Sequence, residues 1–217
     1  MQKNLVRSKK HLFSSLRRHV RSESVIGAME QVPRERFVPV ESRHMAYMDL
    51  PLGIGEGQTI SQPYIVALMI EALVLMGHEK VLEVGTGSGY QAAILSLLVP
   101  RGRVVTVELV PALADRAADL LREPVYRNVE VQLAGSTLGC PSEGPYDAII
   151  VAAASPKLSE SLVSQLAGGG RLVIPVGTLE QQELVRAVRT DEGLSVSMLG
   201  SCRFVPLIGR EAFPRAQ

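Results

Sequence analysis

The chain of 217 residues has 46% hydrophobic and 21% charged residues, an ordinary composition for a globular protein that excludes wholesale disorder. Its 23 Lys and Arg residues nearly balance 22 Asp and Glu residues, so the net charge of +1 neither favours nor excludes a polyanionic partner. The only cysteines, Cys140 and Cys202, form no CxxC pair, and no apolar stretch suits a signal sequence or a membrane span. The sequence therefore predicts a soluble, cytoplasmic protein.

The first 79 residues are expected to be mainly helical. Helices are predicted within 11–20, within 22–32 and from about Ser61 onward, and Ser22 is a plausible N-cap for the second of them. Prolines break up the stretch between the second and third helices: Pro33, Pro39 and Pro51. Asp49, in the same stretch, is expected to cap backbone N–H groups rather than act as a base.

A block of cations precedes the first acidic residue, Glu23: Lys3, Arg7, Lys9, Lys10, Arg17, Arg18 and Arg21. Such a block is able to track the phosphates of a nucleic acid. Charge blocks are more often the solvated face of an amphipathic helix, and we favour that interpretation. Aromatic residues make up only 4% of the chain, with no tryptophan, which argues against base stacking and hence against an RNA partner.

From residue 80 onward, short apolar runs alternate with helical patterns. The predicted strands are 80–84, 102–109, 128–133, 146–154 and 171–177, and the predicted helices are 90–99, 111–123 and 159–166. This alternation favours a doubly wound, mostly parallel sheet of the α/β class. After Gly177, the runs 182–189 and 194–207 have no helix between them, so we expect antiparallel strands at the edge of the sheet.

We divide the chain into two parts within one compact domain. Residues 1–79 are expected to form an N-terminal helical cap that includes a lid loop over substrate and cofactor. Residues 80–217 are expected to form the cofactor-binding core.

A glycine-rich loop, LEVGTGSGY (82–90), joins the first strand of the core to its first helix. Gly85, Gly87 and Gly89 allow a sharp turn and a close approach of the backbone to a ligand. The dinucleotide fingerprint would require a further glycine where Tyr90 stands, and a Walker A ending is absent. We expect Tyr90 and Gln91 to pack at the start of the helix.

Two acidic residues narrow the interpretation of this loop. Glu83 precedes the glycines inside the strand, and Glu108 ends the second strand, where an acid is placed to accept hydrogen bonds from both ribose hydroxyls. The loop and the two acids together are the pattern of class I S-adenosylmethionine (SAM)-dependent methyltransferases. The residues themselves predict a nucleotide-type cofactor that contains a ribose.

Ser61 lies where a polar stretch turns abruptly into an apolar helical pattern. No histidine is near it, and no G-x-S-x-G motif surrounds any serine, so a hydrolase nucleophile is not indicated. Ser61 is either a plain N-cap or a hydroxyl donor to a ligand at a helix N-terminus, where backbone N–H groups favour an anion. The pattern alone leaves both interpretations open.

The chain resembles the protein-L-isoaspartate (D-aspartate) O-methyltransferases in segments 29–39, 46–69, 81–96, 145–156, 169–177 and 203–209. The glycine loop is shared by many methyltransferases, whereas AYMDLPLGIGEGQTISQPYIVALM (46–69) is specific. The resemblance implies a Rossmann-like class I methyltransferase fold, SAM as cofactor and S-adenosyl-L-homocysteine (SAH) as product. It also implies methyl transfer to the free α-carboxylate of L-isoaspartyl residues in damaged proteins and peptides. The resulting ester recloses to a succinimide that hydrolyses partly to aspartate, which initiates repair.

The same resemblance implies roles for individual residues. Ser61 is implied to be catalytic and to bind the substrate carboxylate, which is ionised at pH 7 and needs alignment rather than a general base. Val205 and Pro206 are implied to present backbone to a peptide substrate, although an ordinary edge-strand role is the alternative. The implied cofactor-binding residues, which include a lid strip at 58–60, are Gln58, Thr59, Ile60, Ser61, Glu83, Gly85, Gly87, Gly89, Glu108, Leu109, Gly135 and Ser136.

The sequence departs from the family pattern after the third strand of the core. Where the family usually has an acid that accepts a hydrogen bond from the adenine amino group, this chain has Gly135. Loss of such a charge-assisted hydrogen bond typically costs about 1.5–3 kcal/mol, which Ser136 or a backbone carbonyl would only partly replace. Ile208 also stands where threonine is common. The presence of Glu83 and Glu108 argues against complete loss of cofactor binding.

Two alternative functions stay open at this point. One is a SAM-dependent methyltransferase of the same fold that acts on another acceptor, such as a modified peptide or an RNA. The other, suggested by Gly135, is a weakly active SAM-binding module. We expect isoaspartyl proteins and peptides as partners, a monomer, no membrane and no metal, because the histidines lack metal-ligand spacing: His11, His19, His44 and His78.

Overall fold

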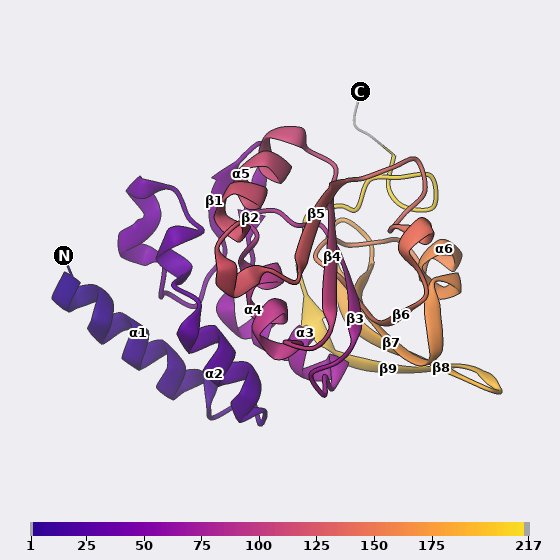
Figure 1. Cartoon of the computed structure of the whole chain (residues 1–217), viewed down its shortest axis with the longest axis horizontal. Coiled ribbons are helices and arrows are strands. Elements are labelled where there is room, and N and C mark those ends of the chain that lie inside the picture. Colours follow the sequence, from indigo (N-terminus) through magenta and orange to yellow (C-terminus); the bar gives the residue numbers. More distant parts are fainter. Residues whose placement is uncertain (1, 215–217) are drawn as a thin grey trace.

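The computed structural model describes residues 2–214 and contains a seven-stranded sheet with helices packed against it (Figure 1). The strands are β3 (Lys80–Val84), β4 (Arg103–Glu108), β5 (Val129–Leu133), β6 (Tyr146–Val151), β7 (Leu166–Gly177), β8 (Gln182–Thr190) and β9 (Gly193–Cys202). Their order in space is β5-β4-β3-β6-β7-β8-β9. β3 to β7 are parallel, whereas β8 and β9 are antiparallel. The mostly parallel sheet with antiparallel edge strands is thereby confirmed.

Helices connect the parallel strands and cover the sheet. The α-helices are α1 (Gln2–Leu16), α2 (Glu23–Gln31), α3 (Pro63–Leu73), α4 (Tyr90–Leu98), α5 (Pro111–Leu121) and α6 (Glu160–Ser164). Short 3-10 helices are η1 (Arg34–Arg36), η2 (Val40–Met45), η3 (Pro124–Tyr126) and η4 (Pro141–Glu143). Pro111 is the first residue of α5, where a missing N–H costs little, as the sequence predicts.

The two faces of the sheet bury different sets of apolar residues. Val81 lies in a cluster with residues of α1 to α5, and this cluster includes Phe13 and Ile26 from the N-terminal helices. Its neighbour Leu82 faces the opposite side, in a second cluster with Leu162 of α6. Strands covered on both faces read as continuous apolar runs, which is why the sequence identifies them.

Strand ends differ from the sequence-based prediction at β6, which ends at Val151 rather than 154, and at β7 and β9. β7 begins at Leu166 rather than 171, so the glycine run that looked like a loop is part of the strand. β9 ends at Cys202 rather than 207. Beyond it, the chain pairs with the stretch that follows β6: Ala154 N donates to Val205 O (2.8 Å) and Leu207 N donates to Ala154 O (2.7 Å). This pairing brings 205–207 to the carboxyl end of the central strands.

The stretch expected to form a lid loop contains a small hairpin. β1 (Leu52–Gly55) and β2 (Gln58–Ile60) pair antiparallel, a feature that the sequence-based prediction missed. Between them, Glu56 and Gly57 both have positive φ (54° and 68°). Tight hairpin turns of this kind match the right-handed twist of paired strands, and glycine adopts such φ values at no steric cost.

Ser61 is not the N-cap of the helix that follows it. α3 begins at Pro63, and its N-cap is Gln62, whose side chain makes no capping hydrogen bond. Proline in the first helical turn leaves the preceding residue in an extended conformation, which moves the helix start beyond the serine. The N-cap interpretation of Ser61 is therefore wrong, and its side chain is available for another role.

The N-terminal cations are partly paired within the molecule. Ser22 caps α2 as predicted, since its side chain accepts a hydrogen bond from Val25 N. Arg17 forms ion pairs with Glu23 (3.2 Å) and Glu30 (2.9 Å). Lys9 Nζ donates to the Glu30 carbonyl at 2.8 Å. The side chain of Lys3 lies outside the described residues.

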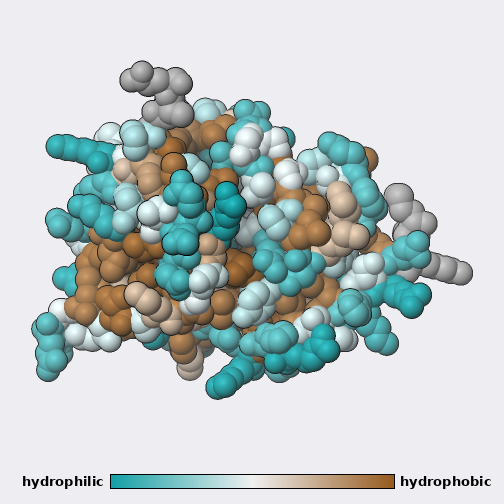
Figure 2. All heavy atoms as spheres, turned by 180° about the vertical axis from the view of Figure 1, so that it is seen from behind, coloured by the Kyte–Doolittle hydropathy of each residue, from teal (hydrophilic) through white to brown (hydrophobic). Residues whose placement is uncertain are grey.

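The free edge of the sheet is apolar. β9 exposes Leu194, Val196 and Met198, which alternate along the strand and so share one face. Figure 2 shows apolar side chains gathered at the left of its view, on the side of the molecule that carries β8 and β9. Among the helices of residues 2–214, none has the length and apolar character that crossing a membrane requires.

Candidate active site

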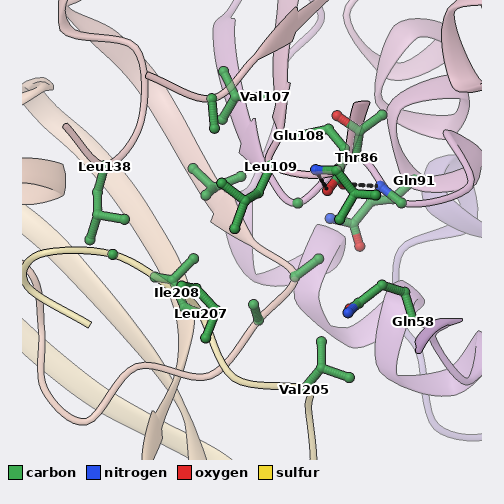
Figure 3. Close-up of a pocket in the computed structure, with 18 of the residues that line it drawn as sticks. Gln58, Thr86, Gln91, Val107, Glu108, Leu109, Leu138, Val205, Leu207 and Ile208 are labelled. Atoms are coloured by element: carbon green, nitrogen blue, oxygen red, sulfur yellow. Dashed lines mark hydrogen bonds between the residues drawn. The ribbon is translucent and has the colours of Figure 1, made fainter. Parts of the chain in front are cut away.

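A cavity opens at the carboxyl ends of β3, β4 and β6, where open α/β sheets bind ligands. The space between its atoms amounts to about 1130 Å³, including the part open to solvent. In Figure 3, side chains from separate segments point into one space: Gln58 from β2, Glu108 from β4 and Val205 from the C-terminal segment. Leu138 lies on the side of this space away from Gln58, and Leu109 lies between Leu138 and Glu108 in this view. Apolar and polar groups from several segments thus converge on one concave site, as in binding sites for small molecules and cofactors.

The glycine loop forms one wall of this cavity. Gly85, Gly87 and Gly89 all have positive φ (94°, 54° and 83°), which favours glycine over residues with a side chain. Gly85 and Gly87 line the cavity. Gly89 does not: a methyl group there would lie 3.3 Å from the Ala117 side chain, so this glycine serves the packing of α4 against α5.

Glu108 ends β4 with its carboxylate held by the surrounding backbone. Oε2 accepts a hydrogen bond from Gly87 N (2.8 Å), and Oε1 accepts one from Val110 N (2.9 Å). The side chain is buried at the cavity wall. Each carboxylate oxygen has a second lone pair for a ligand hydroxyl, so the arrangement fits the ribose of a nucleotide-type cofactor.

Glu83 lies beneath the loop rather than at the cavity wall. It is fully buried, its Oε2 accepts a hydrogen bond from Thr106 Oγ1 (2.5 Å), and its Oε1 has no partner among the described residues. Burial raises the pKa of Glu83 to about 8. The hydrogen bond from Thr106 lowers this pKa, the nearby charge of Glu108 raises it, and Gln91 lowers it. Glu83 is therefore not placed to contact the cofactor directly, as the family resemblance implied that it would be.

Ser61 lies at the cavity wall between β2 and α3. Its hydroxyl makes no hydrogen bond to the rest of residues 2–214, whereas its carbonyl accepts one from Arg34 Nη2 (2.9 Å). The start of α3 is capped from outside the helix, because Asp49 accepts hydrogen bonds from Tyr64 N (2.8 Å) and Gln62 Nε2 (3.1 Å). The capping role predicted for Asp49 is confirmed, and the Tyr64 amide is already occupied by an anion.

Most residues assigned from the family resemblance come together in this cavity. The following line it: Gln58, Thr59, Ile60, Ser61, Gly85, Gly87, Glu108, Leu109, Gly135, Ser136, Val205 and Pro206. Glu83 and Gly89 do not.

Other lining residues were missed or were assigned only to packing. Gln91 and Tyr90, expected to pack at the start of α4, line the cavity, and so do Thr86 and Ser88 of the glycine loop. They directly follow a motif that the sequence does reveal, so proximity to that motif was the available signal. Leu138 comes from an irregular loop with no signal of its own.

The departure at Gly135 leaves open space. Gly135 lines the cavity, its φ is outside the positive range, and a methyl group there would meet no atom within 4 Å. Within the described part of the chain, Glu108 is the one carboxylate that lines the cavity. Residues 2–214 also bring no group of three or more His, Cys, Asp or Glu residues into a metal-binding arrangement.

Comparison with known proteins identifies the family. The family described as protein-L-isoaspartate(D-aspartate) O-methyltransferase matches residues 7–212. The chain belongs to this family. A curated protein-L-isoaspartate O-methyltransferase from Methanoculleus marisnigri is 50% identical over 198 residues, which cover 91% of this chain and 89% of that one.

Solved structures of the family have the same fold. A protein-L-isoaspartate O-methyltransferase superposes with a TM-score of 0.84 at 29% identity, over 94% of this chain and 67% of that one. A structure from Plasmodium falciparum, described as such a methyltransferase in complex with SAH, has a TM-score of 0.80 at 27% identity, over 91% and 96% of the two chains. The Rossmann-like methyltransferase fold, the SAM-dependent family and its enzymatic nature, inferred above from the sequence, are confirmed.

Proposed function

We propose that this protein transfers a methyl group from SAM to the free α-carboxylate of L-isoaspartyl residues in damaged proteins and peptides and thereby initiates their repair. The observation that carries the proposal is the meeting of two sets of residues in one cavity. The glycine loop and Glu108 form a wall suited to a nucleotide, and Ser61 lies in the same cavity with a hydroxyl that has no hydrogen-bond partner among residues 2–214.

The cofactor end of the cavity fits SAM. Glu108 would accept hydrogen bonds from the ribose hydroxyls, and the backbone of Gly85 and Gly87 would lie against the amino-acid part. Leu109, Gly135 and Ser136 would border the adenine. When bound, SAM supplies a methyl group on a sulfonium sulfur, which the acceptor oxygen attacks as the carbon–sulfur bond breaks and neutral SAH leaves.

The acceptor end of the cavity needs no general base. A carboxylate with an ordinary pKa of about 4 is ionised at pH 7 and is already nucleophilic. Ser61 Oγ would donate a hydrogen bond to one carboxylate oxygen and leave the other directed at the methyl group. Catalysis then rests on alignment and exclusion of water, which is able to lower the barrier by about 7–11 kcal/mol in well-oriented systems.

The C-terminal segment would hold the peptide around the acceptor. Ala154 engages one edge of 205–207, and on the other edge Pro206 has a carbonyl but no N–H, so an extended peptide would find a hydrogen-bond acceptor there. Gln58, Thr59 and Ile60 of β2 lie at the cavity wall and would cover cofactor and acceptor together.

The test uses pure protein, methyl-labelled SAM and two peptides that differ only in one L-isoaspartyl or L-aspartyl linkage. We expect base-labile label on the isoaspartyl peptide alone. Ser61→Ala should lower turnover at least tenfold while changing the dissociation constant of SAH less than threefold. SAH binding without label on either peptide would contradict the proposed acceptor, and equal loss of SAH binding and turnover in Ser61→Ala would contradict the role of Ser61.

A further inference from the structure

Arg34 is a buried arginine behind the wall of the active site. It lies in η1, within the segment VPRERF, and none of its surface is exposed. Arginine is rarely buried without a carboxylate partner, because removing its charge from water is costly. Arg34 makes no ion pair with any residue in 2–214, so its charge is not neutralised by direct contact.

The guanidinium joins three segments that surround the acceptor end of the cavity. Its Nε donates to the Ala46 carbonyl (2.9 Å), in the stretch that leads to Asp49, and its Nη2 donates to the Ser61 carbonyl (2.9 Å). Its central carbon lies 5.0 Å from the ring centroid of Tyr90, a residue of the cavity wall. Nη1 is buried and has no partner among the described residues.

These contacts hold the peptide unit that carries the Ser61 side chain. A guanidinium is planar and rigid, and two of its N–H groups here fix two backbone carbonyls in a defined relative position. Ser61 lies outside any regular element, between β2 and α3, and so lacks the support of a ladder or a helix. Its carbonyl is fixed by Arg34 instead.

We propose that Arg34 is a positioning residue for the methyl acceptor, which fixes the Ser61 backbone so that the hydroxyl faces the cavity. The inference rests on the proposed function. It assigns to Arg34 an effect on the acceptor step that acts through Ser61 and that a purely structural arginine would not have.

The experiment compares Arg34→Lys with Arg171→Lys. Arg171 is a matched control, because it also donates to two backbone carbonyls, of Leu73 (2.7 Å) and Val74 (3.1 Å), but does not line the cavity. Lysine keeps the charge in both variants and loses the planar pair of donors. For each variant we measure thermal stability, the dissociation constant of SAH, and kcat and KM for the isoaspartyl peptide.

We expect both variants to lose stability to a similar extent. Only Arg34→Lys should lower kcat/KM for the peptide, by at least tenfold, with less than threefold change in SAH affinity. Because the effect acts through Ser61, Arg34→Lys should lower activity less than threefold in a Ser61→Ala background. Residues that act as a unit show such non-additivity, whereas independent residues do not.

Each other outcome contradicts the inference. Equal loss of activity in Arg34→Lys and Arg171→Lys, or the full tenfold loss in the Ser61→Ala background, would show that Arg34 only supports the fold. If Arg34→Lys does not fold, Arg34→Gln is measured in the same way, and failure of both to fold while Arg171→Lys folds would likewise assign Arg34 to the fold. An inactive wild type that binds SAH but not the isoaspartyl peptide would overturn the proposed function itself, and the inference with it.

Discussion

The Asp49 carboxylate accepts a hydrogen bond from the Tyr64 amide at 2.8 Å and so caps a helix that begins at Pro63. The cap comes from a loop rather than from the N-cap residue, since the Gln62 side chain donates to Asp49 and makes no capping bond of its own. Ser61 lies between this cap and the Arg34 hydrogen bond to its carbonyl. Its position thus depends on interactions on both sides.

Two substitutions of Asp49 distinguish its role as a helix cap from the effect of its negative charge. Asp49→Asn keeps an oxygen acceptor and should change the free energy of unfolding by less than about 0.5 kcal/mol, whereas Asp49→Ala should lower it by about 1 kcal/mol. Asp49→Asn keeps the cap, and Asp49 does not line the cavity, so KM for the isoaspartyl peptide should match that of the wild type. Asp49→Ala should raise that KM, because the start of α3 loses its fixed position. Denaturant unfolding and steady-state kinetics measure these quantities.

Ser22→Ala provides the matched control for the cap. Ser22 accepts a hydrogen bond from Val25 N at the start of α2 and does not line the cavity. Ser22→Ala should lower the free energy of unfolding by about as much as Asp49→Ala does, without changing kcat or KM. The same kinetic change in Ser22→Ala and Asp49→Ala would indicate general loss of stability rather than a displaced Ser61.

Gly135→Asp should strengthen cofactor binding. The position lines the cavity, has room for a side chain and does not require glycine for its backbone conformation. A carboxylate there would offer an acceptor to the adenine amino group, and hydrogen bonds to charged groups contribute about 1.5–3 kcal/mol, which corresponds to a roughly tenfold or larger decrease in the dissociation constant. Calorimetric titration with SAH measures the change directly.

Gly168→Asp is the control for added charge. Gly168 lies in β7, also has open space around it, and does not line the cavity. It should leave SAH affinity unchanged. Affinity that stays the same or decreases in Gly135→Asp would mean that the adenine does not lie beside this loop.

The sheet and most of the cavity are predictable from sequence because their signals are local. Strands buried on both faces read as apolar runs, and the glycine loop needs glycines for its positive φ values. The hairpin of β1 and β2 was missed because Glu56 stands at a positive-φ position where glycine or asparagine is the usual signal. Tertiary structure imposes that conformation, and the local sequence does not indicate it.

The site features that sequence analysis missed or left open depend on contacts distant in the chain. Glu83 is next to the glycine loop in sequence, yet the direction of its side chain places it against Thr106 of the neighbouring strand. Ser61 looks like an N-cap because the cap that replaces it, Asp49, comes from an earlier loop. Arg34 carries no signal at all, because nothing in its segment indicates that its partners are the carbonyls of Ala46 and Ser61.

Glu83 should make the stability of the protein pH-dependent. Its pKa is raised to about 8, from an ordinary value near 4.5, so the folded protein binds a proton that the unfolded chain releases between those values. The stabilising contribution is therefore complete below pH 4.5 and is lost as the pH rises through 8, by up to about 1.4 kcal/mol per pH unit. Glu83→Gln, which cannot ionise, should remove this slope. Denaturant unfolding from pH 5 to 9 measures it.

Glu79→Gln is a control with the opposite sign. Burial raises the pKa of Glu79, but backbone N–H donors of 76–79 outweigh it and leave the pKa lowered. Glu79 therefore stabilises the protein when ionised, and its replacement should destabilise the protein at neutral pH. A slope between pH 5 and 8 that persists in Glu83→Gln would assign the pH dependence to another group.

Glu211 should hold the C-terminal segment that forms one wall of the cavity in place. Its carboxylate accepts hydrogen bonds from the Ser161 hydroxyl, from Ser161 N (3.1 Å) and from Ser159 Oγ (2.7 Å), and these lower its pKa to about 2. The anchoring is therefore present above pH 4.5 and is lost only as the pH falls toward 2. Because Leu207 and Ile208 of the anchored segment line the cavity, Glu211→Gln should weaken SAH binding severalfold and speed proteolysis of the segment at neutral pH.

Glu160→Gln tests whether this effect belongs to the anchor. Glu160 is exposed in the first turn of α6, the helix that carries Ser161, so its replacement removes an equal charge and leaves the Glu211 hydrogen bonds in place. SAH affinity and proteolysis should match the wild type. If Glu160→Gln and Glu211→Gln weaken SAH binding equally, the charge near α6 matters and the anchor does not. If neither substitution weakens SAH binding, the cavity wall keeps its position through the pairing of Val205 and Leu207 with Ala154.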